Sequence, residues 1–348
     1  MTSLLASLAT PLRRSLGQAL GRVVDPFVIG SFDRTGYRIH ALRFDPADLD
    51  VDLSDRRIVV TGANSGIGFE TAAALGERGA QIVLLCRNRA RGEAAQAELR
   101  CRVGADRFEL EVCDVSDLGS VRRAAARLGE RVDGLVHNAG VLPDRRVETA
   151  DGLELTFATH VAGPFLLTEL LRPALERSPD GRVVWVSSGG MYTRRLQVDD
   201  PDWTQRPYDG VVAYAETKRA QVVLAERFAA AFAGTSVLVT AMHPGWADTP
   251  AVRSSLPGFH RVTRAILRTP PEGADTVAWL AAAPRDRLES GAFYFDREAR
   301  RTHWLPGTRE SQVERDALWR RCRTAAAPRG VERAIVPIRA RARPVPSP

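Results

Sequence analysis

The stretch IVVTGANSGIG, residues 58–68, decides the fold of this chain. It opens with an apolar run that lacks alternation, as in a strand buried on both faces. Glycines at 62, 66 and 68 then permit a tight turn and a close approach of the backbone to a phosphate group at the start of a helix. A glycine-rich loop in this position predicts a dinucleotide site in a βαβ unit. The alternative is a glycine turn that serves packing alone.

The alternation of strand and helix continues along the chain. Strands are expected at 58–62, 81–86, 108–112, 133–140, 182–188 and 236–245, and helices at 66–77, 89–100, 118–128, 152–175 and 211–233. This pattern predicts a single α/β domain, a Rossmann-like doubly wound parallel sheet flanked by helices. The expected organisation is an N-terminal extension (1–50), the nucleotide-binding domain (51–305), a C-terminal helix (306–325) and a basic Pro/Arg-rich tail (326–348) that is expected to be disordered.

Composition narrows the class of protein. The net charge of +7 gathers at the two ends of the 348-residue chain, and no zinc-finger spacing, basic helix with heptads or RNA-binding signature occurs, so nucleic acid is not an expected partner. The four cysteines show no paired spacing and the histidines show no ligand spacing, which argues against both a disulfide framework and a metal site. The protein is therefore expected to be cytoplasmic, with reduced thiols.

The N-terminal segment 1–24 forms a candidate amphipathic helix. Leu4, Leu8, Leu12, Leu16 and Leu20 lie along one side of it. No apolar run approaches the ~18 residues of a transmembrane helix, but such a segment can make peripheral contact with a membrane surface. Packing on the protein itself or on a second subunit is the interpretation we favour, because membrane-surface helices are a minority among amphipathic ones.

The residues after the second and third strands indicate the cofactor. Where an acidic residue would accept from a ribose 2′-hydroxyl, the chain has Arg87 and Asn88, which favours NADP over NAD. In an arginine-rich chain, Arg87 can equally be a solvated surface residue. Beyond the third strand, Asp114 and the adjacent Val115 are candidates for the adenine site, although Asp114 could instead cap the next helix.

The stretch AYAETKRA, residues 213–220, contains the single lysine among 49 basic residues, Lys218. Tyr214 and Lys218 are four residues apart in an expected helix, so their side chains lie on one face. A neighbouring ammonium is expected to lower the pKa of the phenol from its ordinary value of about 10 and make it a proton donor for a carbonyl under reduction. Ser188, at the end of an expected strand, can hydrogen-bond the same oxygen. Taken alone, a Tyr-x-x-x-Lys pair is more often a surface helix pair.

The motifs TGANSGIG, CDV, HNAG, a serine ending the fifth strand, YAETK and HPGWADT follow in this order across about residues 55–300. Together they resemble the classical short-chain dehydrogenase/reductase family. The segments DLDVDL, YDGVVAYAETKRAQVVL and MHPGWADTPAVRSSLPGFH most resemble its branch that contains dehydrogenase/reductase family member 12 and the retinol dehydrogenases.

The resemblance implies a role for each matching residue. Tyr214 would be the catalytic acid/base, Ser188 would orient the substrate carbonyl, and Lys218 would bind the nicotinamide ribose and lower the pKa of the tyrosine. A compact ammonium suits that task better than a planar guanidinium. Asn138 would brace the central strand and Thr249 would hold the nicotinamide carboxamide. The cofactor-binding residues would be Gly62, Asn64, Ser65, Gly66, Ile67, Gly68, Arg87, Asn88, Asp114, Val115, Asn138, Ala139, Gly140, Tyr214, Lys218, Pro244, Gly245 and Thr249.

One departure from the family pattern concerns the catalytic set. His160 stands where the family has an asparagine that helps hold a water in a proton relay from the lysine to solvent. The histidine could conduct protons itself, displace the water and slow turnover, or pack as a satisfied side chain. The alternative to an enzyme is a nucleotide-binding regulatory or scaffold protein that keeps the fold without turnover. Family analogy further implies a homo-oligomer.

Two apolar segments are expected to cover the site. The segment between Ser188 and Tyr214 is longer than in short family members, and residues 246–267 contain Leu256, Phe259, Ile266 and Leu267. Such lids suggest a lipophilic small-molecule substrate, an aldehyde, ketone or secondary alcohol. The same residues could instead pack on the domain or on a partner subunit.

Overall fold

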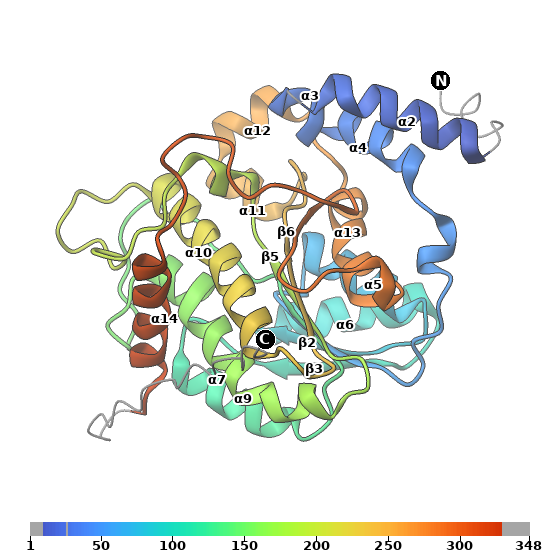
Figure 1. Ribbon diagram of the computed structural model, residues 1–348. Helices are drawn as coiled ribbons and strands as arrows, with labels where there is room; N and C mark the ends of the chain where they lie inside the picture. The colour runs from blue at the N-terminus through green and yellow to red at the C-terminus, as the bar shows by residue number, and fades with distance from the viewer. Residues whose placement is uncertain (1–9, 26, 329–348) are drawn as a thin grey trace, which may run out of the picture.

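A computed structural model describes residues 10–25 and 27–328. Its sheet has the strand order β3-β2-β1-β4-β5-β6-β7-β8 (Figure 1), with every pairing parallel except the last, between β7 and β8. The order reverses between β1 and β4, and a parallel sheet binds its ligands beside such a switch point. The strands are β1 (Arg57–Thr61), β2 (Gln81–Cys86), β3 (Phe108–Val112), β4 (Gly134–His137), β5 (Arg182–Val186), β6 (Leu238–Met242), β7 (Phe293–Phe295) and β8 (Glu298–Ala299).

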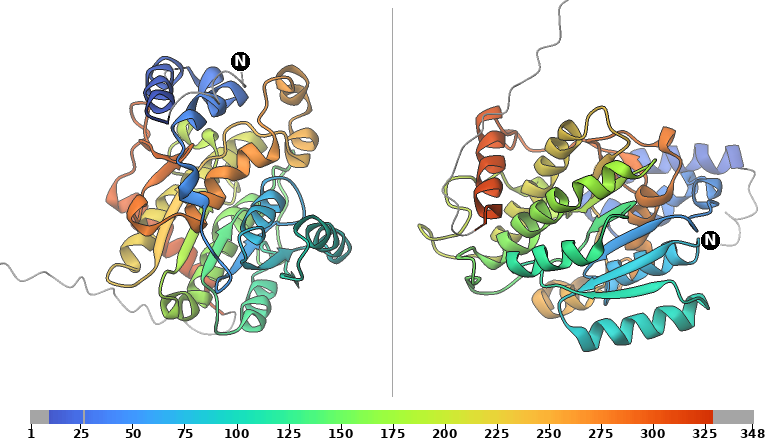
Figure 2. Two further views of the ribbon diagram at one scale, coloured as in Figure 1. Left: turned by 90° about the vertical axis from the view of Figure 1, so that its right-hand side faces the viewer. Right: turned by 90° about the horizontal axis from the view of Figure 1, so that it is seen from below.

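Helices cover both faces of the sheet (Figures 1 and 2), because the central strands bury alternate residues in two separate cores. Val59, Val183 and Trp185 belong to the core on one face, and Ile58, Val60 and Val184 to the core on the other. The first face carries α7 (Leu118–Leu128), α9 (Gly163–Arg177), α10 (Gly210–Ala231) and α14 (Gln312–Ala326); the second carries α5 (Gly66–Gly76), α6 (Arg89–Val103) and α13 (Pro270–Ala282).

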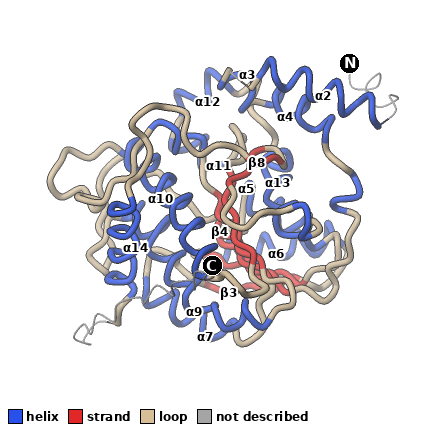
Figure 3. Tube along the Cα trace, viewed as in Figure 1, coloured by secondary structure: helices blue, strands red, loops and turns tan. Residues whose placement is uncertain are grey.

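Short elements join and extend this frame (Figure 3). The N-terminal segment forms α2 (Thr10–Val24), α3 (Val28–Phe32), α4 (Arg34–His40), η1 (Ala41–Arg43) and η2 (Pro46–Leu49). Between β4 and β5 lie α8 (Leu155–Phe157) and the π-helical turn η3 (Ala158–Ala162). The remaining elements are η4 (Gly189–Thr193), α11 (Pro250–Ser255), α12 (Pro257–Thr263) and η5 (Arg285–Arg287).

The expected doubly wound fold is confirmed, and several boundaries differ. The region 152–175, expected as one helix, begins at Leu155 and passes through a π-helical turn. The C-terminal helix begins at Gln312 rather than at 306, because Ser311 and Glu314 form a capping box there. Strands β7 and β8 were not expected, since Phe293–Phe295 is too short to show a period. Most of the predicted disordered tail lies outside the described residues.

Helix α2 packs on the protein through a glycine face. A Cβ at Gly17 would lie 2.9 Å from Leu42 Cβ, so only glycine permits this approach. Outside this contact, Leu12, Leu20 and Val23 are 56%, 37% and 64% exposed. The helix thus contacts its own domain, as favoured, but through a different face from the leucine side; Leu4 and Leu8 lie outside the described residues. None of the helices within 10–25 and 27–328 combines the length and apolarity needed to cross a membrane.

Candidate active site

The glycine-rich loop between β1 and α5 lies very close to the segment that follows β4. Gly62 has a φ of 66°, and a Cβ there would lie 2.9 Å from Ala139 Cα. A Cβ at Gly68 would lie 2.4 Å from Asn138 Nδ2, so both positions require glycine. Ser65 precedes α5 without making a side-chain cap, which leaves the first N–H groups of the helix to a ligand. Since Asn64, Ser65, Gly66 and Ile67 retain solvent exposure, this loop fits the pyrophosphate of a dinucleotide.

Asn138 ties the end of β4 to the end of β1. Its Nδ2 donates to Thr61 O at 2.9 Å and to Gly62 O at 3.3 Å, while the backbone N–H groups of Asn138 and Ala139 donate to Thr61 Oγ1. These bonds hold the glycine loop against the neighbouring strand. Gly140 follows at an exposed position beside the imidazole of His160.

Arg87 and Asp114 meet at the carboxyl ends of β2 and β3. The Arg87 Nε lies 3.9 Å from Asp114 Oδ2, and the arginine side chain is 65% exposed, so this ion pair leaves the guanidinium free to contact an added anion. Asp114 accepts from the N–H and hydroxyl of Ser116 and does not cap α7, which Asp117 does. Asn88 caps α6 through its side-chain oxygen, and Val115 is buried.

Ser188 and Tyr214 come together at the carboxyl end of β5. Ser188 precedes η4 and accepts from Gly190 N at 3.3 Å, and Tyr214 projects from the first turns of α10 to form a hydrogen bond with Ser188. Burial raises the pKa of the Tyr214 phenol, and the hydrogen bond with Ser188 acts in the opposite direction. The phenol is therefore protonated at neutral pH, ready to donate.

Lys218 lies one turn further along α10. Its ammonium lies 5.4 Å from the Tyr214 ring centroid and donates to Val186 O at 2.9 Å and to Gln221 Oε1 at 3.0 Å. Burial lowers the pKa of Lys218 to about 7. The pKa of Tyr214 is raised in this structure, with burial as the largest cause, so the lowering by Lys218 stays a prediction. Removal of the phenol from water dominates, and two of the lysine's N–H bonds go to other acceptors.

His160 is a satisfied, neutral side chain. Its Nε2 accepts from Val141 N at 3.0 Å, which leaves the ring proton on Nδ1 to donate to Thr217 Oγ1 at 2.8 Å. Burial, followed by the charge of Lys218, holds the pKa of His160 well below its ordinary value. The ring packs edge-on against Tyr214 with centroids 5.3 Å apart. Of the three interpretations of this residue, the geometry fits the packed histidine, because both ring nitrogens are engaged and the partner of Nε2 is a backbone N–H, which does not supply protons near neutral pH.

The loop after β6 holds Pro244, Gly245 and Thr249 near the glycine loop. Thr249 caps α11 through Oγ1, and a Cβ at Gly66 would lie 3.2 Å from Thr249 Cγ2. Both Trp246 N and Arg268 Nε donate to Phe32 O, from the N-terminal segment. The sequence did not reveal Phe32 and Arg268, whose partners lie far away in the chain. It did not reveal Gln221 either, although its spacing of three residues from Lys218 was a signal that could have been used.

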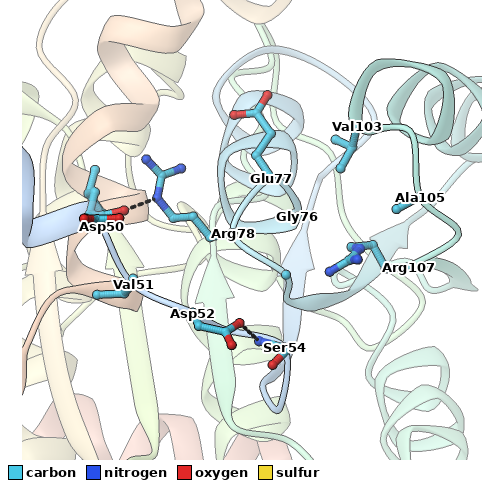
Figure 4. Close-up of a pocket in the computed structure, with 12 residues that line it drawn as sticks. Asp50, Val51, Asp52, Ser54, Gly76, Glu77, Arg78, Val103, Ala105 and Arg107 are labelled. Carbon is cyan, nitrogen blue, oxygen red and sulfur yellow. Dashed lines mark hydrogen bonds between the residues drawn. The ribbon is translucent and has the colours of Figure 1, made fainter.

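A separate groove lies away from these residues. Figure 4 shows it at the amino ends of the strands, beside the start of β1 and the end of α5. Its lining includes Asp50, Asp52, Arg78 and Arg107, and none of the site residues above. Arg78 is engaged there with Leu49 O and Ala74 O. The assembled residues at the opposite edge of the sheet, and not this groove, therefore define the candidate site.

Comparisons with known proteins agree with this geometry. Residues 56–258 match the family model of the short chain dehydrogenases. The chain is 42% identical to dehydrogenase/reductase SDR family member 12 of Bos taurus over 82% of its length and 91% of that protein. It is 34% identical to human retinol dehydrogenase 13 over 69% and 76% of the two chains. The structure is similar to a short chain dehydrogenase from Escherichia coli complexed with NADPH, with a TM-score of 0.57, 25% identity and coverage of 72% and 98%.

Proposed function

Because this chain belongs to the short chain dehydrogenase family and is therefore an oxidoreductase, we propose that it interconverts a lipophilic carbonyl compound and its alcohol with NADP. The observation that carries this proposal is the convergence of Ser188, Tyr214 and Lys218 at the carboxyl edge of the sheet, beside the glycine loop. The Rossmann fold positions these side chains, and the set supplies the acid needed for carbonyl reduction.

Tyr214, Ser188 and Lys218 each have a separate role in the proposed reaction. A bound nicotinamide supplies a hydride in reduction and accepts one in oxidation. Tyr214 donates its phenolic proton to the oxygen of the carbonyl, and the Ser188 hydroxyl donates a hydrogen bond to the same oxygen. Two N–H bonds of Lys218 go to Val186 O and Gln221 Oε1, so its third remains to bind a ribose hydroxyl. In the oxidation direction, Tyr214 takes up the alcohol proton.

The preference for NADP rests on Arg87. Its exposed guanidinium stands at the end of β2, where a 2′-phosphate would lie, and no acidic residue occupies the end of that strand. The relative from Escherichia coli named above is complexed with NADPH. We expect the protein to bind NADPH at least about tenfold more tightly than NADH, since a charge-assisted contact contributes about 1.5–3 kcal/mol.

Fluorescence titration of both nucleotides against the original protein and Arg87→Ala tests this preference. The variant should lose the advantage of NADPH and keep its affinity for NADH. Arg89→Ala is a matched control, because Arg89 is a similarly exposed arginine two residues away that pairs with Glu93. Equal affinities for the two nucleotides in the original protein would contradict the NADP preference, and failure of both to bind would contradict the oxidoreductase site itself.

The proposal of a lipophilic substrate rests on the apolar surroundings of the loop after β6. Trp246 packs edge-on against Phe259 of α12, with ring centroids 5.4 Å apart, and against Phe32 at 6.2 Å. The name of human retinol dehydrogenase 13, a relative at 34% identity, refers to retinol, which is a lipophilic alcohol. Leu256, Phe259 and Ile266 keep partial exposure, whereas Leu267 is fully buried and belongs to the core.

For partners, we propose that the exposed apolar side of α2 makes peripheral contact with a membrane. Gly17 and Gly21 face η1 and His40, and Leu12, Leu20 and Val23 stay exposed with respect to the described residues, 10–25 and 27–328. Arg22, exposed on the same helix, adds attraction to anionic lipid headgroups. A homo-oligomer is proposed by analogy with the family, and burial of the same side of α2 against a second copy is the competing explanation.

A further inference from the structure

One of the two acceptors bonded to the Lys218 ammonium is a side chain, Gln221. Lys218 Nζ donates to Gln221 Oε1 at 3.0 Å, and Gln221 Nε2 donates to His160 O at 3.0 Å. The bond to His160 O fixes the orientation of the carboxamide, so its oxygen must face the ammonium. Gln221 and His160 are fully buried and Lys218 is 3% exposed.

This bridge of two hydrogen bonds joins α10, which carries Tyr214 and Lys218, to the turn η3, which carries His160. Gln221 stands one turn after Lys218 on α10, and His160 lies in the π-helical turn η3, a local widening of the helix typical of functional sites. Lys218 Nζ also donates to Val186 O, at the end of β5. The ammonium is thus located by one strand and by one carboxamide that is itself anchored on η3.

We propose that Gln221 is a positioning residue that holds Lys218 charged and oriented, in the place where the family pattern calls for a water on the lysine. An uncharged carbonyl oxygen favours the ammonium over the neutral amine, because its partial negative charge attracts a full positive charge more strongly than a neutral N–H. The catalytic consequence rests on the function proposed above; the positioning of the ammonium does not.

The bridge also closes one route for protons. A primary amide neither gains nor loses a proton near neutral pH, unlike a water or a hydroxyl. On the inner side, His160 Nδ1 and Nε2 are engaged with Thr217 and Val141, and its ring is neutral. Neither the carboxamide of Gln221 nor the ring of His160 therefore replaces the proton that Tyr214 gives up, and Tyr214 itself keeps partial exposure.

Two titratable side chains face the ammonium, Tyr214 on the same helix and His160 on η3. Both are neutral at pH 7 by the directions of their pKa shifts. Burial is the cause that lowers the pKa of Lys218. A change at Gln221 should therefore be read directly in the titration of Lys218.

The chain offers an unusually direct measurement, because Lys218 is its only lysine. Protein grown on lysine labelled with ¹³C at Cε gives a single lysine resonance, whose chemical shift reports the protonation of Lys218 between pH 5 and 10. Gln221→Met keeps the size of the side chain and removes both hydrogen bonds. Gln221→Glu keeps the size and adds a negative charge.

We expect Gln221→Met to lower the titration midpoint by about one to two pH units and Gln221→Glu to raise it. The pH profile of carbonyl reduction should move in the same directions, whereas a merely structural role would reduce stability without moving either midpoint. Gln96→Met is the matched control, because Gln96 also donates from Nε2 to a backbone carbonyl, Phe108 O, far from the site.

An unchanged midpoint in Gln221→Met or Gln221→Glu would overturn the inference. Should Gln221→Met not fold, the charged variant alone decides, since it must raise the midpoint if the carboxamide faces the ammonium. Titration of the original protein with NADPH separates the two proposals. If the titration midpoints shift in the variants but NADPH does not bind the original protein, the positioning role of Gln221 stands and the proposed function is contradicted. If NADPH binds but the midpoints do not move, the proposed function stands and the positioning role is contradicted.

Discussion

Tyr214 is held in its protonated form by burial. Removal of the phenol from water raises its pKa, and the hydrogen bond with Ser188 opposes that effect only in part. The phenol is supported through the backbone as well, since Thr217 Oγ1 donates to Tyr214 O at 2.9 Å and receives the ring proton of His160. A neutral phenol favours the reductive direction, in which the residue must donate.

Tyr214→Phe should therefore abolish most of the turnover and leave the cofactor site intact. We expect carbonyl reduction of a long-chain aldehyde such as decanal to fall by about 10²- to 10⁴-fold, the usual contribution of a general acid. NADPH affinity should change little. Tyr294→Phe serves as the control, because the Tyr294 hydroxyl accepts from Glu289 N and is not among the residues of the candidate site. Full activity in Tyr214→Phe would contradict the assigned role and favour another proton donor.

At the scale of elements, the N-terminal segment is joined to the domain by a buried ionic cluster. His40 of α4 bonds Asp25 at 2.9 Å and Asp296, in the turn between β7 and β8, at 2.6 Å. Arg268 forms an ion pair with Asp296 and donates to the carbonyls of Ser31 and Phe32. Because Phe32 O also accepts from Trp246 N, this cluster positions the loop after β6.

The cluster predicts how stability depends on pH. Burial would lower the pKa of His40, but its hydrogen bonds to Asp25 and Asp296 outweigh burial and raise the pKa above 6.5. A raised folded-state pKa stabilises the fold fully below the unfolded pKa of about 6.5, and this stabilisation is lost as pH rises through the folded pKa. Asp25 and Asp296 have lowered pKa values, so their contribution is present above about pH 4 and is lost on acidification.

We expect His40→Gln to flatten the alkaline decline in the free energy of unfolding that begins above about pH 6.5, measured by urea denaturation from pH 5 to 9. His260→Gln is the control, because His260 contacts the partly exposed Asp248 within the surface segment 246–267. This variant should leave the decline unchanged. An identical pH dependence in His40→Gln and the original protein would show that this cluster does not govern it.

Over the whole molecule, segments from both ends of the chain reach the active-site region. The C-terminal segment is anchored beside Lys218, because the buried Arg219 forms an ion pair with Glu310 and donates to Thr302 O and the His303 ring. Tyr192 of η4 donates to Arg301 O at 3.0 Å. Residues 306–311, before α14, were expected to be part of a helix. They belong instead to a loop that runs over the residues that follow Ser188 (Figure 1).

The exposed side of α2 gives a prediction at the same scale. The full chain should float with vesicles that contain phosphatidylserine, and Leu12→Gln with Leu20→Gln and Val23→Gln should prevent this by removing the apolar contact. Replacement of Leu170, an exposed leucine on α9, by Gln is the control. If the triple variant floats like the original chain, α2 does not mediate the contact. Light scattering on both proteins tests the alternative, in which the triple variant instead dissociates an oligomer.

Local patterns determined the fold and most of the candidate site. The apolar runs of β1 and β2, the glycines at 62, 66 and 68, and the spacing of Tyr214 and Lys218 each express a short-range rule, a buried strand, a tight turn or one face of a helix. These rules act within a few residues of the chain, so they can be read from the sequence without knowledge of the packing.

Only the tertiary structure decided the electrostatics around these residues. The raised pKa of Tyr214, the neutral His160 and the bridge through Gln221 depend on burial and on partners more than 30 residues away in the chain, such as Val186 and His160. The face through which α2 packs was likewise set by Leu42 and Arg43, which meet Gly17 and Gly21. A sequence pattern states which residues share a face, whereas the free energy of a buried charge depends on what lies against it in space.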